Sequence, residues 1–210
     1  MKKYPMELFE AFARAMGSSK EYLADKIDIV IDYADKGNIF NDVPIAKDAI
    51  GLLQIKDKLM QHKLKRNAFI FLKEIHAGKI DSVNRFEKMM RHEKKKAYEF
   101  ADTTLSILVS DQRGIKSQAI AKLILSLGEG DITINEFDDM LLIIEAASIP
   151  AIKALICLDI TKEIRLQEAA SNQESLISTL GVGVRFGTQY SFNEFGKKLH
   201  KCLSRETALL

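Results

Sequence analysis

Arg85 and His92 are the two residues of this sequence whose types and spacing best suit catalysis. Seven residues make about two turns of an α-helix, so both side chains would lie on the same face of a helix through this stretch. A histidine placed there could take a proton from a ribose hydroxyl, while the arginine stabilised charge on the neighbouring phosphate. One hypothesis is therefore RNA cleavage without a metal ion.

The same stretch, RFEKMMRH, resembles the loosely spaced Arg-to-His motif of HEPN-type ribonucleases, which are all-α proteins. That resemblance implies a ribonuclease toxin with Arg85 and His92 as its catalytic residues. The chain departs from the family at Phe86, where the motif usually carries a polar residue. With four histidines in the chain, chance matches to so loose a spacing are also common. A solvated basic helix is the interpretation that we favour.

The acidic stretch GEGDITINEFDDM is similar to the second half of a calcium-binding loop. If Glu136 were its last ligand, Leu125 and Leu127 would occupy early ligand positions, where calcium needs oxygen atoms. Thr133 and Glu136 have instead the spacing of a helix capping box. The histidine at position 92 also lacks a second histidine four residues on. We therefore expect neither a metal nor a cofactor, and Thr133→Ala should cost about 1 kcal/mol through loss of the cap.

A basic segment spans residues 56–96, where thirteen Lys and Arg residues stand against five Asp and Glu. The whole chain has a net charge of only +2, so the remainder is acidic. Such a segment, interleaved with apolar residues, is typical of a solvated face or of a surface that binds a polyanion, an acidic protein or anionic lipid. The candidate anion-binding residues are Lys63, Lys65, Arg66, Arg91, Lys94, Lys95 and Lys96. Reversing Lys94, Lys95 and Lys96 to Glu should abolish such binding while the fold stays intact.

Further back in the chain, apolar residues recur every three to four positions and predict the helices that would carry these side chains. The predicted helices cover residues 4–17, 18–37, 43–78, 81–111 as a short and a longer helix, 117–130, 133–147, 150–158 and 161–181. The 43–78 stretch is either one long helix or two, broken near His62. Ser18 and Glu21 predict a second capping box. Alternation then predicts a hairpin over 182–192 and a last helix over 193–203.

The terminal hairpin raises the question of a DNA-reading wing. The helix predicted before it has no Lys or Arg, so Asn172 and Gln173 would lack phosphate contacts to fix their position on DNA. We expect a structural module instead, in which Arg185→Ala has little effect and Phe195→Ala costs about 3 kcal/mol or more. Its basic residues should lie on the outer face of the last helix, and Gly196 should permit a close approach. These residues are Lys197, Lys198, His200 and Lys201.

The composition is that of an ordinary globular protein, with 47% hydrophobic and 29% charged residues in a chain of 210. Glu7 and Glu10 interrupt the N-terminus where a signal peptide needs an apolar core. Cys157 and Cys202 are far apart and have neither disulfide-framework nor zinc-site spacing. We expect a soluble, cytoplasmic protein without a transmembrane segment. The fold class is mainly α: a multi-helix bundle with a small C-terminal β-hairpin and terminal helix, winged-helix-like in its ending. We divide it into a helical domain over 1–158 and a helix–hairpin–helix module over 159–210, which could also be one continuous domain.

Three segments resemble a group of uncharacterised bacterial and prophage helical proteins similar to the abortive-infection alpha group. These are a proline-led helix with a basic-aromatic helix, a helix pair joined by Gly and a Thr-x-x-Glu-Phe cap, and a hairpin ending in which Tyr-x-x-x-x-x-Gly leads into a basic helix. They span residues 41–75, 118–146 and 176–202. The resemblance implies a role in phage–host conflict without established chemistry. Charges at Lys47, Asp48, Lys56 and Asp57 argue against membrane insertion of the proline-led segment.

The sequence thus favours a non-enzymatic, cytoplasmic, helical interaction protein linked to phage defence or superinfection immunity. Its partner would be an unknown protein or a polyanion. Self-association into a homo-oligomer and peripheral contact with a membrane stay open. Two alternatives remain: the ribonuclease toxin, and a nucleic-acid-binding regulator that uses the 56–96 segment or the C-terminal module.

Overall fold

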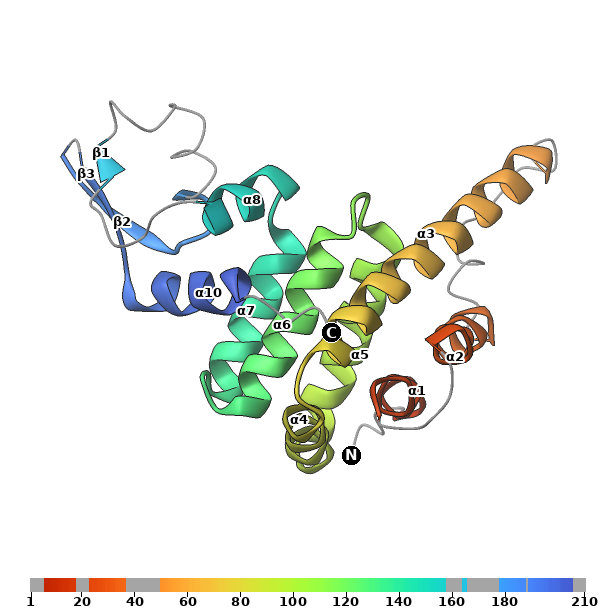
Figure 1. Cartoon of the computed structure of the whole chain (residues 1–210). Helices are drawn as coiled ribbons and strands as arrows, with labels where there is room; N and C mark the ends of the chain where they lie inside the picture. The colour runs from red at the N-terminus through yellow and green to blue at the C-terminus, as the bar shows by residue number, and fades with distance from the viewer. Residues whose placement is uncertain are drawn as a thin grey trace.

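The computed structural model describes residues 6–17, 23–36, 50–157, 164–165, 178–187 and 189–205. Helices make up most of this part of the chain, and a small antiparallel hairpin followed by a helix lies near the C-terminus (Figure 1). The predicted fold class, mainly α with a C-terminal hairpin and terminal helix, is confirmed. Ser18, Glu21, Asn172 and Gln173 lie outside the described residues, so the second capping box stays a prediction.

The first three helices are α1 (Glu7–Met16), α2 (Leu23–Lys36) and α3 (Ile50–Ala77). Gly17 follows α1 as predicted, and its N–H donates to the carbonyl of Ala13. Helix α3 is one continuous helix of 28 residues, which decides between the two forms that the sequence left open. It crosses the molecule diagonally, and its N-terminal end extends beyond the neighbouring helices (Figure 1).

Five helices follow in short succession: α4 (Ile80–His92), α5 (Lys94–Ser110), α6 (Ile115–Glu129), α7 (Ile134–Ala146) and α8 (Ile149–Cys157). Helix α6 is buried over most of its length, because most of its residues are apolar or small. Helices α3, α4, α5, α7, α8 and the terminal helix all contact it. Gly128 of α6 permits the closest of these approaches, since a Cβ there would lie 1.9 Å from the carbonyl oxygen of Ser82 in α4.

Phenylalanine side chains from five helices fill the centre of the helical part. Phe86 of α4 meets Phe100 of α5 edge-to-face at 5.1 Å between ring centroids, and Phe137 of α7 at 5.6 Å. Phe12 of α1 meets Phe71 of α3 at 6.0 Å. All five rings are fully buried. Edge-to-face pairs of this kind add to the hydrophobic gain of burial, so the first half of the chain is tied to α7.

The C-terminal part contains β1 (Ile164–Arg165), β2 (Gly183–Phe186), β3 (Gln189–Phe192) and α10 (Glu194–Ser204). Strands β2 and β3 form the predicted hairpin, and β1 pairs antiparallel with the other edge of β3. The helix predicted over 161–181 is therefore wrong at Ile164 and Arg165. The pairing of Ile164 with Tyr190 overrides local helical preference there.

Helix α10 is capped by Asn193, whose side-chain oxygen accepts a hydrogen bond from the Gly196 N–H at 2.7 Å. A Cβ on Gly196 would lie 1.9 Å from the Val182 carbonyl oxygen. The predicted close approach is confirmed, and the neighbour is the start of the hairpin. Leu199 is fully buried as expected, whereas Phe195 is only partly buried, so its removal should cost less than the sequence suggested.

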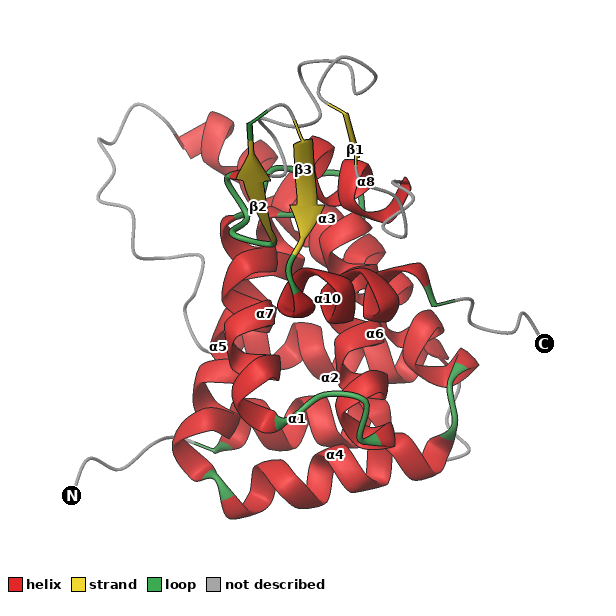
Figure 2. Cartoon of the chain, turned by 90° about the vertical axis from the view of Figure 1, so that its left-hand side faces the viewer, coloured by secondary structure: helices red, strands yellow, loops and turns green. Residues whose placement is uncertain are grey.

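The buried side of α10 belongs to the same hydrophobic core as the helices before it. Its contacts are with α6 and α8 as well as with β3. The division at residues 158 and 159 stays a prediction. Figure 2 shows the two ends of the molecule: α4 lies across one end, and the three strands lie at the other. The centre of the basic segment and the terminal hairpin are thus far apart.

Candidate anion-binding surface

The structure places the basic segment on α3, α4 and α5 and separates its cations into two groups. The first group contacts the protein itself. Arg91 of α4 is its clearest member, because one of its Nη atoms lies 2.9 Å from Glu10 of α1 and 2.7 Å from Glu87. The hydrogen bonds that the Arg91 guanidinium donates to Glu10 and then to Glu87 raise its pKa above the usual value. Arg91 therefore joins α4 to α1, and its charge is balanced locally.

Lys96 of α5 is a second internal contact. Its ammonium lies 2.7 Å from Asp138 Oδ2 and 2.7 Å from Asn135 Oδ1, both on α7. Glutamate at position 96 would place two carboxylates against each other at this junction. The expectation that reversal of Lys94, Lys95 and Lys96 together leaves the fold intact is therefore withdrawn, because Lys96 has a structural role.

Arg66 of α3 is a third internal contact, at the C-terminal end of α5. It donates to the Asp111 backbone carbonyl at 3.0 Å and to the side-chain oxygen of Asn67. The amide of Asn67 is buried and donates to the carbonyls of Leu108 and Asp111, each at 2.7 Å. These bonds satisfy carbonyls that the end of a helix leaves open. Nothing in the local sequence around Arg66 indicates the contact with Asp111, since the two residues lie 45 positions apart.

The Asp111 side chain closes the same junction from the other side. Its carboxylate accepts from the N–H groups of Gly114 and Ser117 and from the Ser117 hydroxyl, at 2.9 to 3.0 Å. Gly114 begins α6 in the left-handed region, with φ of 75°. The buried aspartate thus caps α6, a role that the sequence analysis missed. A carboxylate three residues before a glycine that opens an apolar helix was its only local signal.

The second group of basic residues is exposed around the corner between α4 and α5. We call it the α4–α5 corner and define it as Lys88, His92, Lys94 and Lys95. Lys94 and Lys95 are exposed at the first turn of α5, and Lys95 lies 3.4 Å from the exposed Glu99. That turn contains no acidic residue, and Glu93 at the N-cap makes no side-chain capping bond. Lysines oppose the positive end of a helix dipole, so the local arrangement favours an anion from outside.

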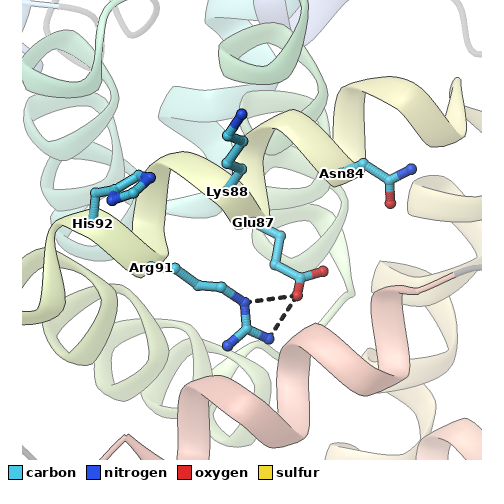
Figure 3. Close-up of a pocket in the computed structure, with 5 residues that line it drawn as sticks. All are labelled: Asn84, Glu87, Lys88, Arg91 and His92. Carbon is cyan, nitrogen blue, oxygen red and sulfur yellow. Dashed lines mark hydrogen bonds and ion pairs between the residues drawn. The ribbon is translucent and has the colours of Figure 1, made fainter.

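A shallow groove of about 380 Å³ runs along α4 next to this corner (Figure 3). Asn84, Glu87, Lys88, Arg91 and His92 line it. Asn84, Lys88 and His92 are four residues apart and share one face of the helix. Lys88 points away from the Glu87–Arg91 pair, whose bonds Figure 3 marks. The groove therefore offers an amide, an ammonium and an imidazole beside one ion pair, and these groups suit phosphate or carboxylate oxygens.

Arg85 and His92 share the exposed face of α4 expected from their spacing. Arg85 donates from Nε to the backbone carbonyl of Asp81 in its own helix, at 3.3 Å. Of the two, only His92 lines the groove. Lys63 and Lys65, the remaining candidates, lie on α3, where Lys65 is exposed and Lys63 partly so.

The stretch that is similar to a calcium loop forms the predicted capping box. The N–H of Glu136 donates to Thr133 Oγ1, and the Thr133 N–H donates to Glu136 Oε2 at 2.8 Å. The flanking apolar residues Ile132 and Phe137 are both buried. In the part of the chain that the structure describes, no group of three or more His, Cys, Asp or Glu side chains could hold a metal ion. Failure to bind calcium stays a prediction.

The basic face of α10 contacts acidic residues at the end of α6 and the start of α7. Lys198 pairs with Glu136, Lys201 with Asp131 at 3.0 Å, and Arg205 with Glu129. The Lys198 hydrogen bond, together with the Thr133 backbone N–H, lowers the pKa of Glu136 to about 2. Opposite charges in the 129–139 and 197–205 stretches were the available sequence signal. The Arg185 side chain lies outside the described residues.

The two cysteines are free thiols with different surroundings. Cys157 is exposed at the end of α8, and Cys202 is on the buried side of α10. Burial raises the pKa of the Cys202 thiol, which makes it less reactive.

Comparison with protein-family models, curated proteins and solved structures finds no match to this chain. Among the described helices, none combines the length and the apolar character that crossing a bilayer requires. Arguments about function therefore rest on the contacts and charges above.

Proposed function

We propose that this protein is a non-enzymatic helical interaction protein that binds an anionic macromolecule through the α4–α5 corner. One observation carries the proposal: Lys94 and Lys95 stand exposed on the uncapped first turn of α5. Lysines at this position weaken the helix unless an anion compensates them. Lys95 pairs with the exposed Glu99, whereas Lys94 has no ion pair among the described residues. Residues that break a local rule in this way are common at functional sites.

The neighbouring groove supports the same proposal. Lys88 and His92 line it about one turn apart, and His92 ends α4 two residues before α5 begins. Arg91 and Glu87 pair with each other in its lining, and Arg91 joins that lining to α1 through Glu10. A partner would therefore meet side chains on a fixed helix, and little ordering would be needed on binding.

The experiment is charge reversal at exposed positions only, assayed by retention on immobilised heparin at increasing salt. Lys88→Glu and Lys94→Glu should each elute at lower salt than the parent, and the double variant at the lowest. Lys153→Glu is the matched control. Lys153 is exposed on α8, and its substitution changes the net charge by the same amount as each single variant. Equal elution of all the variants would reject the corner as the binding surface.

The ribonuclease remains the second candidate, and exposure of His92 in a groove is the observation that favours it. In that case His92 would act as the general base and Arg85 would stabilise the phosphate. A purified-protein assay on single-stranded RNA tests it: cleavage that His92→Ala removes would replace the interaction proposal with an enzymatic one. Persistent cleavage in that variant would exclude this pair.

The regulator alternative rests on the basic segment rather than on the C-terminal module, because Lys198 and Lys201 already pair with acidic side chains. For the biological setting, we infer a role in phage defence or superinfection immunity, supported by the resemblance of three segments to the abortive-infection alpha group. Phage plating on a bacterial host tests it. Expression of the parent should reduce plaques, and the Lys88→Glu/Lys94→Glu double variant should restore them.

A further inference from the structure

The exposed face of α3 carries a run of basic and aromatic residues that the proposed function does not use. Between residues 60 and 77, five side chains of α3 are exposed, and none of the five is acidic. Their spacing of three or four residues places them on one face over roughly 21 Å of helix. We call this face the α3 ridge: His62, Lys65, Phe69, Lys73 and His76.

Phe69 is the centre of the α3 ridge, with 45% of its surface exposed. One exposed phenylalanine on a protein surface means little by itself. Here, Lys65 stands one turn before it and Lys73 one turn after it, on the same face. An acidic residue on this helix, Glu74, is buried and accepts a hydrogen bond from Gln118. It therefore does not cancel the positive charge of the two lysines at the surface.

His76 at the C-terminal end of the ridge adds little positive charge. Its Nε2 lies 3.3 Å from the Lys26 ammonium of α2. Burial and then the Lys26 charge lower the pKa of the His76 imidazole. The imidazole therefore stays neutral at physiological pH, and the charge of the ridge comes mainly from Lys65 and Lys73.

We propose that the α3 ridge binds single-stranded nucleic acid, with one base stacked on Phe69 and its flanking phosphates on Lys65 and Lys73. The two lysines are eight residues apart, roughly 12 Å along the axis. A nucleotide within a strand has one phosphate on each side of its base, which matches a cation on each side of a ring. Bases stack on exposed aromatic side chains in this way in proteins that bind single strands. A duplex is excluded, because its base faces are already stacked.

The test uses the absence of tryptophan from the chain. Phe69→Trp creates a single tryptophan, on the ridge, and Leu142→Trp creates a matched exposed one on α7. Titration with an oligouridylate of about 12 nucleotides, a length suited to such sites, should quench the tryptophan at position 69 and leave that at position 142 unchanged. Inorganic polyphosphate, which has charge and no base, should quench neither. Equal quenching at both positions, or none at position 69, would overturn the proposal.

Affinities of the labelled oligouridylate give the second readout. Phe69→Ala should weaken binding about 5- to 100-fold, whereas Phe69→Tyr should retain it, because stacking on the ring is preserved. Lys65→Glu and Lys73→Glu should weaken binding and reduce its salt dependence. Circular dichroism checks that each exposed-site variant is folded.

The α3 ridge and the α4–α5 corner are on different helices, so a failure of the nucleic-acid proposal can be distinguished from a failure of the proposed function. Lys88→Glu should leave quenching at position 69 unchanged. Displacement of the oligouridylate by polyglutamate at equal charge concentration would show an acidic-protein surface and overturn the nucleic-acid proposal. An unchanged affinity in Phe69→Ala would do the same.

Discussion

At the residue scale, Thr104 is a polar side chain placed among apolar ones in the middle of α5. It is fully buried, and its hydroxyl has no hydrogen-bond partner among the described residues. A buried hydroxyl without a partner costs free energy that a methyl group of similar shape does not. We expect Thr104→Val to raise the free energy of unfolding by about 1 kcal/mol, measured by urea denaturation. Thr103→Val, at the partly exposed neighbour, should change it by less than about 0.5 kcal/mol; equal effects would contradict this account of Thr104.

Thr133 gives the second prediction at this scale, because its capping box is complete. Thr133→Ala should lower the free energy of unfolding by about 1 kcal/mol, since the Glu136 N–H loses its acceptor. Thr133→Ser keeps the hydroxyl and should stay close to the parent. Denaturant titrations of the two variants compare them directly. A loss of stability in the serine variant equal to that of alanine would assign the effect to packing instead of capping.

The capping box could be predicted from sequence because its bonds join residues only three positions apart. The roles of Arg91 and Lys96 could not be predicted in this way. Arg91 reaches Glu10 across 81 positions, and Lys96 reaches Asn135 across 39. Whether a lysine or arginine is exposed or paired depends on which helix packs beside it, and the local pattern does not contain that information.

At the element scale, the approach of α10 to the hairpin depends on Gly196. A methyl group there would meet the Val182 carbonyl oxygen at 1.9 Å, and that oxygen also accepts from the Asn193 N–H. We expect Gly196→Ala to lower the free energy of unfolding by about 2–3 kcal/mol, because backbone has to move. Lys197→Ala, at the exposed next position, is the control and should cost less than about 0.5 kcal/mol. Thermal or urea denaturation that gives similar values for both would refute the close approach.

Elements were predictable where they are long and strongly patterned. The apolar spacing, Gly17 after α1 and Thr133 before α7 indicated those helices correctly. Strand β1 was missed, because two residues carry no alternation and Ile164 becomes a strand only by pairing with Tyr190. Its partner, β3, lies beyond the stretch of chain that the sequence pattern assigns to helix.

At the scale of the whole molecule, opposite charges hold the terminal helix against α6 and α7. The folded-state pKa of Glu136 is about 2, below its usual value near 4.5. Because the pKa of this carboxylate is lower in the folded chain than in the unfolded chain, the unfolded chain binds more protons at pH values between the two. The free energy of unfolding therefore rises with pH in that range. The contribution of Glu136 should be fully present above about pH 4.5 and should decline as the pH falls toward 2.

Lys198→Met tests that window, since Lys198 is the main cause of the pKa shift. The stability difference between parent and variant should be largest above pH 4.5 and should shrink toward pH 2, in urea titrations over pH 2 to 6. Lys153→Met, at an exposed lysine on α8, is the control and should give a difference independent of pH. A Lys198→Met difference that does not vary with pH would show that the Glu136 pair contributes nothing to stability.

The distribution of charge over the whole molecule could be predicted only in part from the sequence. The excess of cations between residues 56 and 96 was evident, and the structure divides those cations between internal contacts and exposed positions. Lys88, Lys94 and Lys95 are available to a partner because all three are exposed; in the described part of the chain, only Lys95 of these has an ion pair, with the exposed Glu99. The central claim is that these exposed cations, and not the segment as a whole, bind an anionic partner.

Heparin affinity measured as a function of salt tests that claim most directly. For the parent, the logarithm of the binding constant should fall linearly with the logarithm of salt concentration, because neutralised anions release counterions. The Lys88→Glu/Lys94→Glu variant should bind at least tenfold more weakly at 50 mM salt, on the order expected for lost ionic contacts, with a shallower slope, whereas Lys153→Glu should match the parent. An identical slope and affinity in the double variant would contradict the claim.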